Sequence, residues 1–236
     1  MPDDILITIR KELARLVDEK TSAQYKRFFK EEVKYYGVKT GLVMKIAALY
    51  FQQVKPLGKK EVFRLCEELL KSDYSEEAFI ACEWSYRFHS QYEPDDFFTF
   101  EDWLKQYIDN WAKCDTLCNH TIGAIVDKYP QYLQNLKQWA KSDNRWVRRA
   151  AAVTLIIPAK RGKFLKDILE IADILLTDPD DLVQKGCGWM LKDASIKYQA
   201  EVLDYVMKNK KVMPRTALRY AVERMPPDLK RRAMAK

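Results

Sequence analysis

The chain has 236 residues, 47% of them apolar, and is long enough to bury a substantial core, which argues against a disordered chain. Its seven glycines are few for a protein built on β-turns. The net charge of +7 is concentrated over residues 208–236, where ten lysines and arginines stand against two acidic residues; this favours a polyanionic partner, with a solvated basic tail as the alternative.

Apolar residues recur at helical spacing along nearly the whole chain, and sustained period-two alternation is missing, so we expect an all-α fold. The pattern breaks at 34–40, 56–58 and 93–96, which indicates loops. We expect Thr40 to cap one helix, Ser75 to open another, and the glutamates of 61–77 to form a solvated face. The predicted helices cover residues 4–19, 22–33, 41–54, 59–71, 75–90, 100–109, 111–127, 130–141, 144–157, 163–176, 181–196, 198–207 and 215–224.

Two stretches in the second half of the chain are alike and indicate a repeat. Residues 143–151 and 180–188 each open with an acidic residue, carry a branched apolar residue and end in small side chains. Val147 and Val183 are 36 residues apart, and a further step of 36 backwards reaches Trp111. This period fits stacked helix pairs of the HEAT kind, whose usual length is roughly 40 residues. We therefore expect one domain over 1–236, a right-handed-type solenoid of HEAT-like antiparallel helix pairs with a concave basic face: degenerate helices over about 1–55, repeats over about 56–225 and a basic C-terminal end.

The repeat also predicts a surface. With a step of 37 residues, the equivalent pairs on consecutive helices are Trp111 with Asp115, Arg148 with Ala152, and Lys185 with Trp189. A step of 36 instead aligns Lys113, Arg149 and Lys185, and both registers remain open. Either way, one ridge carries indoles, a carboxylate and several cations. A cationic groove with aromatic side chains at its centre is typical of proteins that hold a phosphate backbone while touching nucleosides, so the expected partner is double-stranded DNA.

The remaining chemistry-bearing residues point to structural roles. The cysteines are scattered through apolar helical contexts, which predicts buried thiols without disulfides. Cys114, Cys118 and His120 have the spacing of zinc ligands but no evident fourth ligand, and we expect neither a metal nor an organic cofactor. Trp84 and Trp146 we assign to the core. No apolar run has the length of a membrane span and no signal-peptide pattern occurs, so we expect a cytoplasmic protein with no membrane partner. A solenoid that grips duplex DNA needs no second copy, so we also expect a monomer.

Several motifs keep a specific order and spacing. They are Trp111-x-x-x-Asp115, Ser142-Asp143-Asn144-x-Trp146-x-x-Arg149-Ala150-Ala151, Lys185-x-x-Gly188-Trp189 and, near the start, Tyr36-Gly37-Val38. Together they resemble the AlkD-like DNA alkylation repair proteins, a family of HEAT-like repeat DNA glycosylases. The resemblance covers roughly residues 20–236.

The resemblance implies a monofunctional DNA glycosylase of base excision repair. Its expected substrates are cationic N-alkylated purines, of the 3-methyladenine and 7-methylguanine type, in double-stranded DNA. It implies that Asp115 is the essential carboxylate and that Trp111 and Trp189 flank the damaged nucleoside. A further N-terminal aromatic contact matches Tyr25, while Phe28 fits the spacing about equally well. The expected DNA-binding residues are Lys113, Arg148, Arg149, Lys160, Arg161, Lys163 and Lys185.

Elementary chemistry gives a carboxylate at this place its own rationale. An N-alkylated purine is a cationic, good leaving group, so its glycosidic bond breaks with little need for a general acid. Positive charge then grows on the deoxyribose. A fixed carboxylate beside the sugar, here Asp115, stabilises that oxocarbenium-like state and orients the attacking water. The faces of indole rings stabilise the cationic base.

Two other classes of function stay open on the sequence alone. Asn110 precedes Trp111 where some relatives have a second tryptophan, and some relatives bind DNA without known excision. A non-catalytic binder of damaged or branched DNA is therefore the alternative to a glycosylase. A protein-interaction scaffold is a common role of helical repeats, but it gives no reason for a carboxylate between indoles in a cationic groove.

Overall fold

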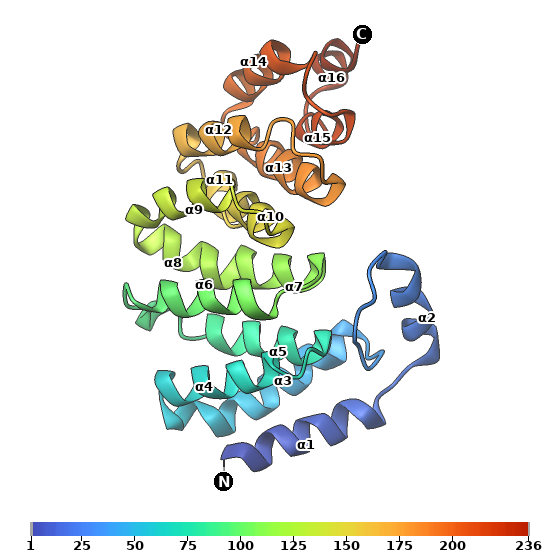
Figure 1. Ribbon diagram of the computed structural model, residues 1–236, viewed down its shortest axis with the longest axis vertical. Helices are drawn as coiled ribbons and strands as arrows, with labels where there is room; N and C mark the ends of the chain where they lie inside the picture. The colour runs from blue at the N-terminus through green and yellow to red at the C-terminus, as the bar shows by residue number, and fades with distance from the viewer. Residues whose placement is uncertain (1, 236) are drawn as a thin grey trace. The chain divides into compact units, whose positions relative to one another are not determined.

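A computed structural model describes residues 2–235, and every regular element in that range is helical, as the hydrophobic periodicity predicts (Figure 1). The chain divides into two compact units, Met1–Leu117 and Cys118–Lys236. Each unit is a stack of short helices joined by short turns. We predicted a single solenoid domain with a concave face. That prediction concerns how the two units are arranged, and it stays a prediction.

The first unit contains seven α-helices and two 3-10 turns within its described residues. They are α1 (Pro2–Arg15), α2 (Glu19–Phe28), α3 (Thr40–Val54), η1 (Lys55–Leu57), α4 (Lys59–Leu70), α5 (Ser75–Tyr86), η2 (His89–Gln91), α6 (Asp96–Tyr107) and α7 (Trp111–Thr116). A π-helical segment, η3 (Leu117–Ile122), starts at the last residue of this unit.

Helix α5 is the centre of the first unit. It packs against α3, α4 and α7, and almost every residue along it is buried. Trp84 on α5 is fully buried and donates its indole N–H to the carbonyl of Ala47 on α3, at 2.8 Å. This bond satisfies the one polar atom of the largest side chain in the core, and it confirms that Trp84 is a core residue.

Helix α2 stands apart from this stack (Figure 1). Thr21 is its only buried residue, so the helix gains little from burial. Its start is set by Asp18, whose side chain accepts from the backbone N–H of Thr21 at 2.7 Å. The first predicted helix runs through Asp18, but the aspartate instead caps the next helix, and α1 ends at Arg15.

The second unit is also built of short helices. Its elements after η3 are α8 (Gly123–Lys128), η4 (Pro130–Tyr132), α9 (Leu133–Trp139), α10 (Arg145–Val153), α11 (Ile156–Lys160), α12 (Leu165–Ile174), α13 (Asp181–Ala194), α14 (Gln199–Asn209), α15 (Arg215–Ala221) and α16 (Pro227–Met234). Helix α13 is the centre and packs against α10, α11 and α15. Trp146 on α10 is buried, as assigned.

Small side chains let the helices of this unit approach closely. A Cβ added to Gly188 on α13 would lie 2.6 Å from the carbonyl oxygen of Ala217 and 2.6 Å from Cβ of Tyr220, both on α15. Such distances are well inside van der Waals contact. Residues 150–152 on α10 are alanines and all are fully buried.

Among the differences from the sequence prediction, three concern prolines or helix starts. The helix predicted over 144–157 is broken at Thr154 into α10 and α11, because Pro158 cannot donate to the carbonyl four residues earlier and its ring would clash there. Thr40 is the first residue of α3 and not its cap, a position held by Lys39 without a side-chain bond. Helix α16 was not expected, and it begins at Pro227, whose fixed φ suits a first turn.

All five cysteines are buried as thiols, as predicted. Burial raises the pKa of Cys66, Cys82 and Cys187, so these thiols stay protonated and behave as small apolar side chains. Across residues 2–235, none of the helices combines the length and the apolar character that crossing a membrane requires.

The contact at Gly188 yields a stability prediction. We expect Gly188→Ala to lower the free energy of unfolding by about 1–3 kcal/mol, because the new methyl group overpacks the α13–α15 contact. Gly186→Ala is the matched control on the same helix: its Cβ would meet the side chains of Arg149 and Val153 at the longer distances of 3.3 and 3.4 Å, so we expect a smaller loss. Urea denaturation measures both, and equal losses would contradict the assignment.

Candidate active site and nucleic-acid interface

Helix α7 presents Trp111 and Asp115 one helical turn apart on the same face, and both side chains are half-buried. The helix starts where it does because Asn110 caps it. The buried Asn110 side chain accepts from the backbone N–H groups of Ala112 and Lys113, each at 3.0 Å. Helix α7 also packs against α5. The first unit therefore sets an indole beside a carboxylate on a helix fixed at its N-terminus.

Lys113, predicted to bind DNA, does not lie on the surface. Its side chain is 1% exposed, and its ammonium contacts the carboxylate of Asp73 at 2.7 Å, the backbone carbonyl of Asp73 at 2.8 Å and the carboxylate of Asp109 at 2.9 Å. All three hydrogens of an ammonium are thereby used. The residue joins α7 to the turn between α4 and α5, and this structural role takes the place of the predicted phosphate contact.

The two carboxylates around Lys113 have opposite pKa shifts. Burial raises the pKa of Asp109, and its hydrogen bond with Asp73 raises it further. For Asp73 burial acts in the same direction, but hydrogen bonds from Lys113 and Asp109 and the charge of Lys113 outweigh it and lower the pKa. Asp73 is therefore the stronger acid of the two, and its negative charge lies next to the buried ammonium.

The aromatic side chain that meets Trp111 in the first unit is Phe29, which the sequence reasoning missed. The two rings are stacked, with centroids 5.3 Å apart and an interplanar angle of 28°. Tyr25 meets Phe29 and Tyr35 edge-on, at 6.1 and 5.1 Å between centroids. Phe28, the other candidate for the N-terminal contact, is 67% exposed. We call Tyr25, Phe29 and Tyr35 the aromatic cluster.

A pocket of about 500 Å³ lies beside the aromatic cluster. Its wall consists of the three rings of the cluster and Tyr74, and charged side chains of both signs surround them. The charged residues of the lining are Lys26, Glu31, Glu32 and Lys34. The ammonium of Lys34 lies 5.6 Å from the centre of the Tyr74 ring, a cation–π contact.

Two glutamates expected on a solvated face are in fact buried at the start of α5. Glu76 is 0% exposed and Glu77 is 1% exposed. Glu76 accepts from the backbone N–H groups of Tyr36, Gly37 and Val38 at 3.0, 2.8 and 3.1 Å. The expectation was wrong because the donors come from a loop some 40 residues away along the chain, which the helical pattern of α5 does not reveal.

In the second unit, the predicted DNA-binding arginines of α10 are engaged within the protein. Arg148 donates Nε to the carboxylate of Asp178 at 2.6 Å and Nη1 to the carbonyls of Ser142 and Asp143 at 2.9 and 3.0 Å. Arg149 is 5% exposed and donates Nη1 to the carbonyl of Leu182 on α13. Both arginines join α10 to the segment around the start of α13, and phosphate contact by either stays a prediction.

Trp189 is half-buried on α13 and its ring is held in place. The indole N–H donates to the carboxylate of Asp193 at 2.7 Å, and Asp193 is paired with Arg224 at 2.9 Å. Lys192 lies 6.0 Å from the centre of the Trp189 ring. One turn before Trp189, Lys185 is paired with Asp181 at 2.6 Å and keeps a third of its side chain exposed.

The basic segment over residues 160–163, at the end of α11 and just after it, is the most accessible part of the predicted DNA-binding set. Lys160 is exposed, and Arg161 and Lys163 have 60% and 46% of their side chains exposed. The latter two share one carboxylate, that of Asp127, at 3.4 and 2.5 Å. Three cations within residues 160–163, two of which share one carboxylate, leave an excess of positive charge at the surface of the second unit.

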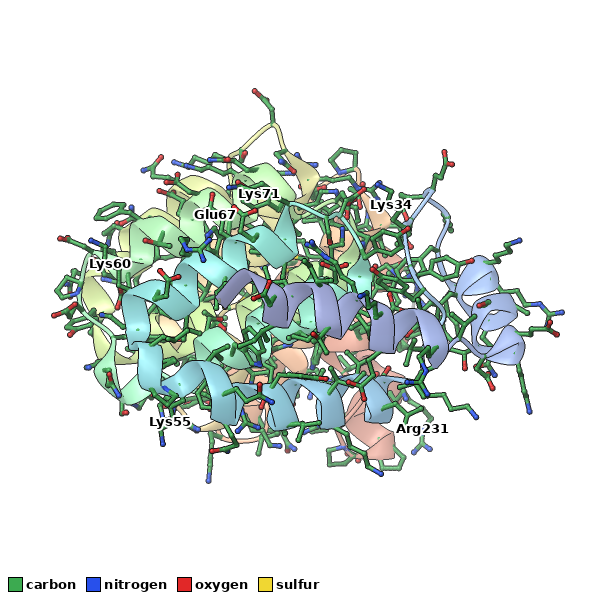
Figure 2. All side chains as sticks on the ribbon, turned by 90° about the horizontal axis from the view of Figure 1, so that it is seen from below. Lys34, Lys55, Lys60, Glu67, Lys71 and Arg231 are labelled. Carbon is green, nitrogen blue, oxygen red and sulfur yellow. The ribbon has the colours of Figure 1, made fainter. Side chains whose placement is uncertain are left out.

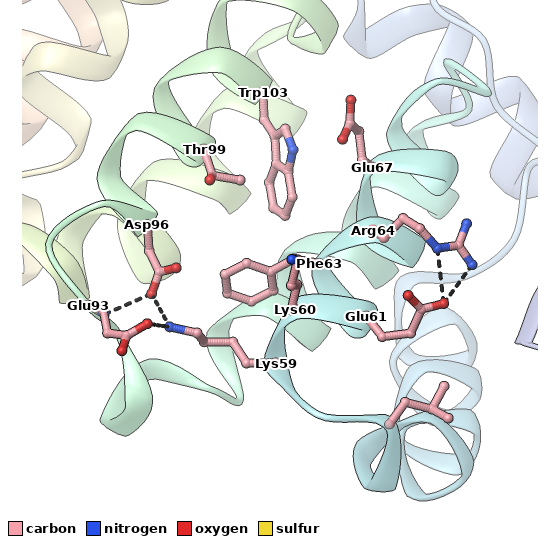
Figure 3. Close-up of a pocket in the computed structure, with 11 residues that line it drawn as sticks. Lys59, Lys60, Glu61, Phe63, Arg64, Glu67, Glu93, Asp96, Thr99 and Trp103 are labelled. Carbon is pink, nitrogen blue, oxygen red and sulfur yellow. Dashed lines mark hydrogen bonds and ion pairs between the residues drawn. The ribbon is translucent and has the colours of Figure 1, made fainter.

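A further pocket of the first unit, between α4 and α6, contains none of the predicted site residues (Figure 3). It has a volume of about 710 Å³ and an apolar floor of Phe63 and Trp103. Its charges are satisfied locally: Lys59 contacts Glu93 and Asp96, and Arg64 contacts Glu61. Lysines on the same unit, among them Lys55, Lys60 and Lys71, project from its surface (Figure 2).

The placement of Lys113 is tested by Lys113→Met. Because the ammonium is buried between two carboxylates, its loss should lower the free energy of unfolding by about 1–3 kcal/mol. It should leave the salt dependence of DNA binding unchanged. Lys60→Met, on the exposed side of α4, is the control and should have little effect on stability. A lower salt slope for Lys113→Met with unaltered stability would contradict the structural role.

Comparisons with known proteins agree with this architecture. The family model described as DNA alkylation repair enzyme matches residues 9–225. One solved structure, titled a predicted DNA alkylation repair enzyme from Enterococcus faecalis, superposes with a TM-score of 0.79 over 89% of this chain and 97% of that one. At 15% identity this likeness shows the fold alone. No curated protein matches the sequence. Because the family model spans most of the chain, this protein belongs to the AlkD-like DNA alkylation repair enzyme family.

Proposed function

We propose that the protein is a monofunctional DNA glycosylase that releases cationic N-alkylated purines from double-stranded DNA. The single observation that carries the proposal is the pairing of Trp111 and Asp115 on α7, whose start is fixed by the Asn110 cap. A carboxylate one turn from an indole, both half-buried, is an arrangement that serves a cationic ligand. Membership of the DNA alkylation repair enzyme family supports alkylated DNA as the source of that ligand.

In the proposed mechanism Asp115 acts on the sugar. As the bond between C1′ and the purine nitrogen breaks, the electron pair leaves with the base, which loses its positive charge. The deoxyribose becomes oxocarbenium-like, and the carboxylate of Asp115 stabilises that developing charge. Water then adds to C1′, and Asp115 orients it and takes up its proton. The base needs no proton from the protein, because alkylation has already made it a good leaving group.

The aromatic residues would hold the base. Trp111 offers an indole face, and the electron-rich face of an indole attracts a cationic purine more strongly than a neutral one. Tyr25 belongs to the aromatic cluster next to Trp111, which supports an N-terminal contribution to the contact. Trp189 of the second unit is proposed as a further contact, because its ring is oriented by the bond to Asp193.

Phosphate binding is proposed for the exposed cations of the second unit, Lys160, Arg161, Lys163 and Lys185. All four carry charge at the surface, and phosphates can replace the carboxylates that now pair with Arg161, Lys163 and Lys185. Arg148 and Arg149 are also proposed to bind phosphate, although they are less exposed. The basic stretch over 208–235 is proposed to bind the flanking DNA backbone. Duplex DNA is the polyanion that the family indicates.

The catalytic assignment predicts the effect of Asp115→Asn. Losing the charge should slow release of 7-methylguanine from a duplex by about 10²–10³-fold, since a preorganised charge at the reacting centre contributes that much. Affinity for the duplex should stay nearly the same, because Asp115 makes no phosphate contact. Single-turnover base release and a binding titration measure the two quantities.

Asp102→Asn is the matched control, because Asp102 is an exposed carboxylate on α6. It should release the base at the rate of the unmodified protein. Normal release by Asp115→Asn would remove the carboxylate from the mechanism. If none of the proteins released base but all bound the duplex tightly, the alternative would hold: a non-catalytic binder of damaged or branched DNA.

The phosphate assignment predicts a smaller salt dependence for the double substitution of Lys160 and Lys163 by Gln. Each lost phosphate contact lowers the slope of log K against log salt by roughly 1, so the slope should fall by about 2. Lys55→Gln, whose side chain projects from the first unit (Figure 2), is the control and should leave the slope unchanged. Equal slopes for all three proteins would show that residues 160–163 do not touch the backbone.

A further inference from the structure

The packing of α2 does not by itself explain why the Phe29 ring stays stacked on Trp111. The helix buries only Thr21, and Phe29 follows its last residue, with an extended backbone (φ −96°, ψ 132°). A helix with so little buried surface does not hold a ring in a stacked position through its own packing. Another part of the first unit must fix it.

The loop that follows α2 supplies the connection. The backbone N–H of Asp18, at the start of α2, donates to the carbonyl of Gly37 at 3.0 Å. The hydroxyl of Tyr35 donates to the carbonyl of Ser22 on α2 at 3.3 Å. Tyr35 also meets Tyr25 of α2 edge-on. Gly37 permits this closeness: it has φ +90°, and an added Cβ would lie 1.9 Å from the Ser22 hydroxyl.

The same loop is held from the other side by α5. Three consecutive backbone N–H groups, of Tyr36, Gly37 and Val38, converge on the carboxylate of Glu76. Successive N–H groups arranged in this way form a concave anion site, and a buried side chain of the protein fills it. The loop carbonyl of Lys34 in turn accepts from the backbone N–H of Ser75 at 2.9 Å.

Glu77 completes the attachment. Its carboxylate accepts from the hydroxyl of Tyr36 at 2.7 Å and from Nε of Arg10 on α1 at 3.0 Å. Burial raises the pKa of the Tyr36 hydroxyl, and the hydrogen bond to Glu77 raises it further, so the hydroxyl remains a proton donor throughout the range in which proteins are stable. The Tyr36 ring stacks on Tyr74, with centroids 4.2 Å apart.

We propose that Glu76 and Glu77 are positioning residues that fix the loop over 34–38 and through it hold the aromatic cluster, with Phe29 stacked against Trp111. The effect of this arrangement on catalysis rests on the proposed function, because the aromatic cluster matters to excision only if Trp111 contacts the damaged base. Phe29 then becomes a determinant of how the base meets the indole. Neither glutamate touches the reacting atoms.

The test uses two conservative variants. Glu76→Gln keeps one oxygen for Gly37 and Val38 but places an NH₂ group against the N–H of Tyr36, and it removes the charge. Tyr36→Phe removes only the hydroxyl group that donates a hydrogen bond to Glu77. This variant tests the proposal even if Glu76→Gln does not fold. Glu68→Gln is the control: Glu68 is a half-buried glutamate of α4 whose side chain is 41% exposed and paired with Lys71.

The first readout does not depend on activity. With 5-fluorotryptophan incorporated, the resonance of Trp111 is identified as the signal missing from Trp111→Phe among those of the six tryptophans. Phe29→Ala marks where the signal moves when the stacked ring is lost. We expect Glu76→Gln and Tyr36→Phe to move it in the same direction, and Glu68→Gln to leave it in place. An unmoved signal in both variants would overturn the proposal.

The second readout separates positioning from general stability. We measure the single-turnover rate of 7-methylguanine release. For both variants this rate should fall about tenfold at a protein concentration too low to saturate the duplex, and by about threefold or less when the duplex is saturated with protein. Affinity for the undamaged duplex should remain within about twofold of the original. A Trp111 signal that moves while excision and lesion affinity stay unchanged would overturn the positioning role. If the unmodified protein neither released nor preferred the lesion while the signal still moved, the proposed function would fail and the link from the glutamates to Trp111 would be supported.

Discussion

The junction between α4 and α5 is the constraint on which the candidate site of the first unit depends. Just before α5 begins, Asp73 has a left-handed backbone conformation with φ 69°. Its carbonyl and carboxylate oxygens accept hydrogen bonds from the buried ammonium of Lys113 on α7. Just after α5 begins, Glu76 holds the loop that follows α2. A few consecutive residues therefore fix two segments that are distant in sequence: the helix that carries Trp111 and the segment that carries Phe29.

The physical reason that this junction is specific lies in the cost of burying charge. A buried carboxylate is tolerated only when its oxygens are hydrogen-bonded. Each hydrogen bond to a charged group contributes about 1.5–3 kcal/mol to the stability of the fold, and removing one partner leaves the other buried and unsatisfied. Glu76 needs the three N–H groups of the loop, and the loop has no helix or strand partner for those groups. Each side satisfies the other, so the loop has one favourable position. For a weakly buried helix such as α2, this requirement supplies the order that apolar packing does not.

Local signals were sufficient for most of the fold but not for the surroundings of the site. The helices follow from apolar periodicity, and Trp84 could be placed in the core because no polar partner at helical spacing gave it another role. The burial of Glu76 could not be predicted in this way, because two glutamates in the first turn of a helix look the same whether they face water or a distant loop. The one local clue is Gly37, a glycine that directly follows two tyrosines. Phe29 was missed for a related reason: which of two adjacent phenylalanines faces Trp111 depends on where α2 ends.

The arrangement of cations shows why net charge is a poor guide to a nucleic-acid surface. The chain has 41 lysines and arginines, yet Lys113 and Arg148, both placed on the predicted ridge by repeat register, hold helices together inside their units. A repeat aligns backbone positions, and the same position can face a neighbouring helix in one repeat and solvent in another. What remains available to a phosphate is a cation whose present partner can be exchanged. Arg161 and Lys163 meet this condition, because they share the single carboxylate of Asp127 and a phosphate offers more acceptor oxygens and more charge than half a carboxylate does. In the proposed function, exchange of the partners of Arg161 and Lys163 then adds to the excess of positive charge by which the second unit would bind DNA.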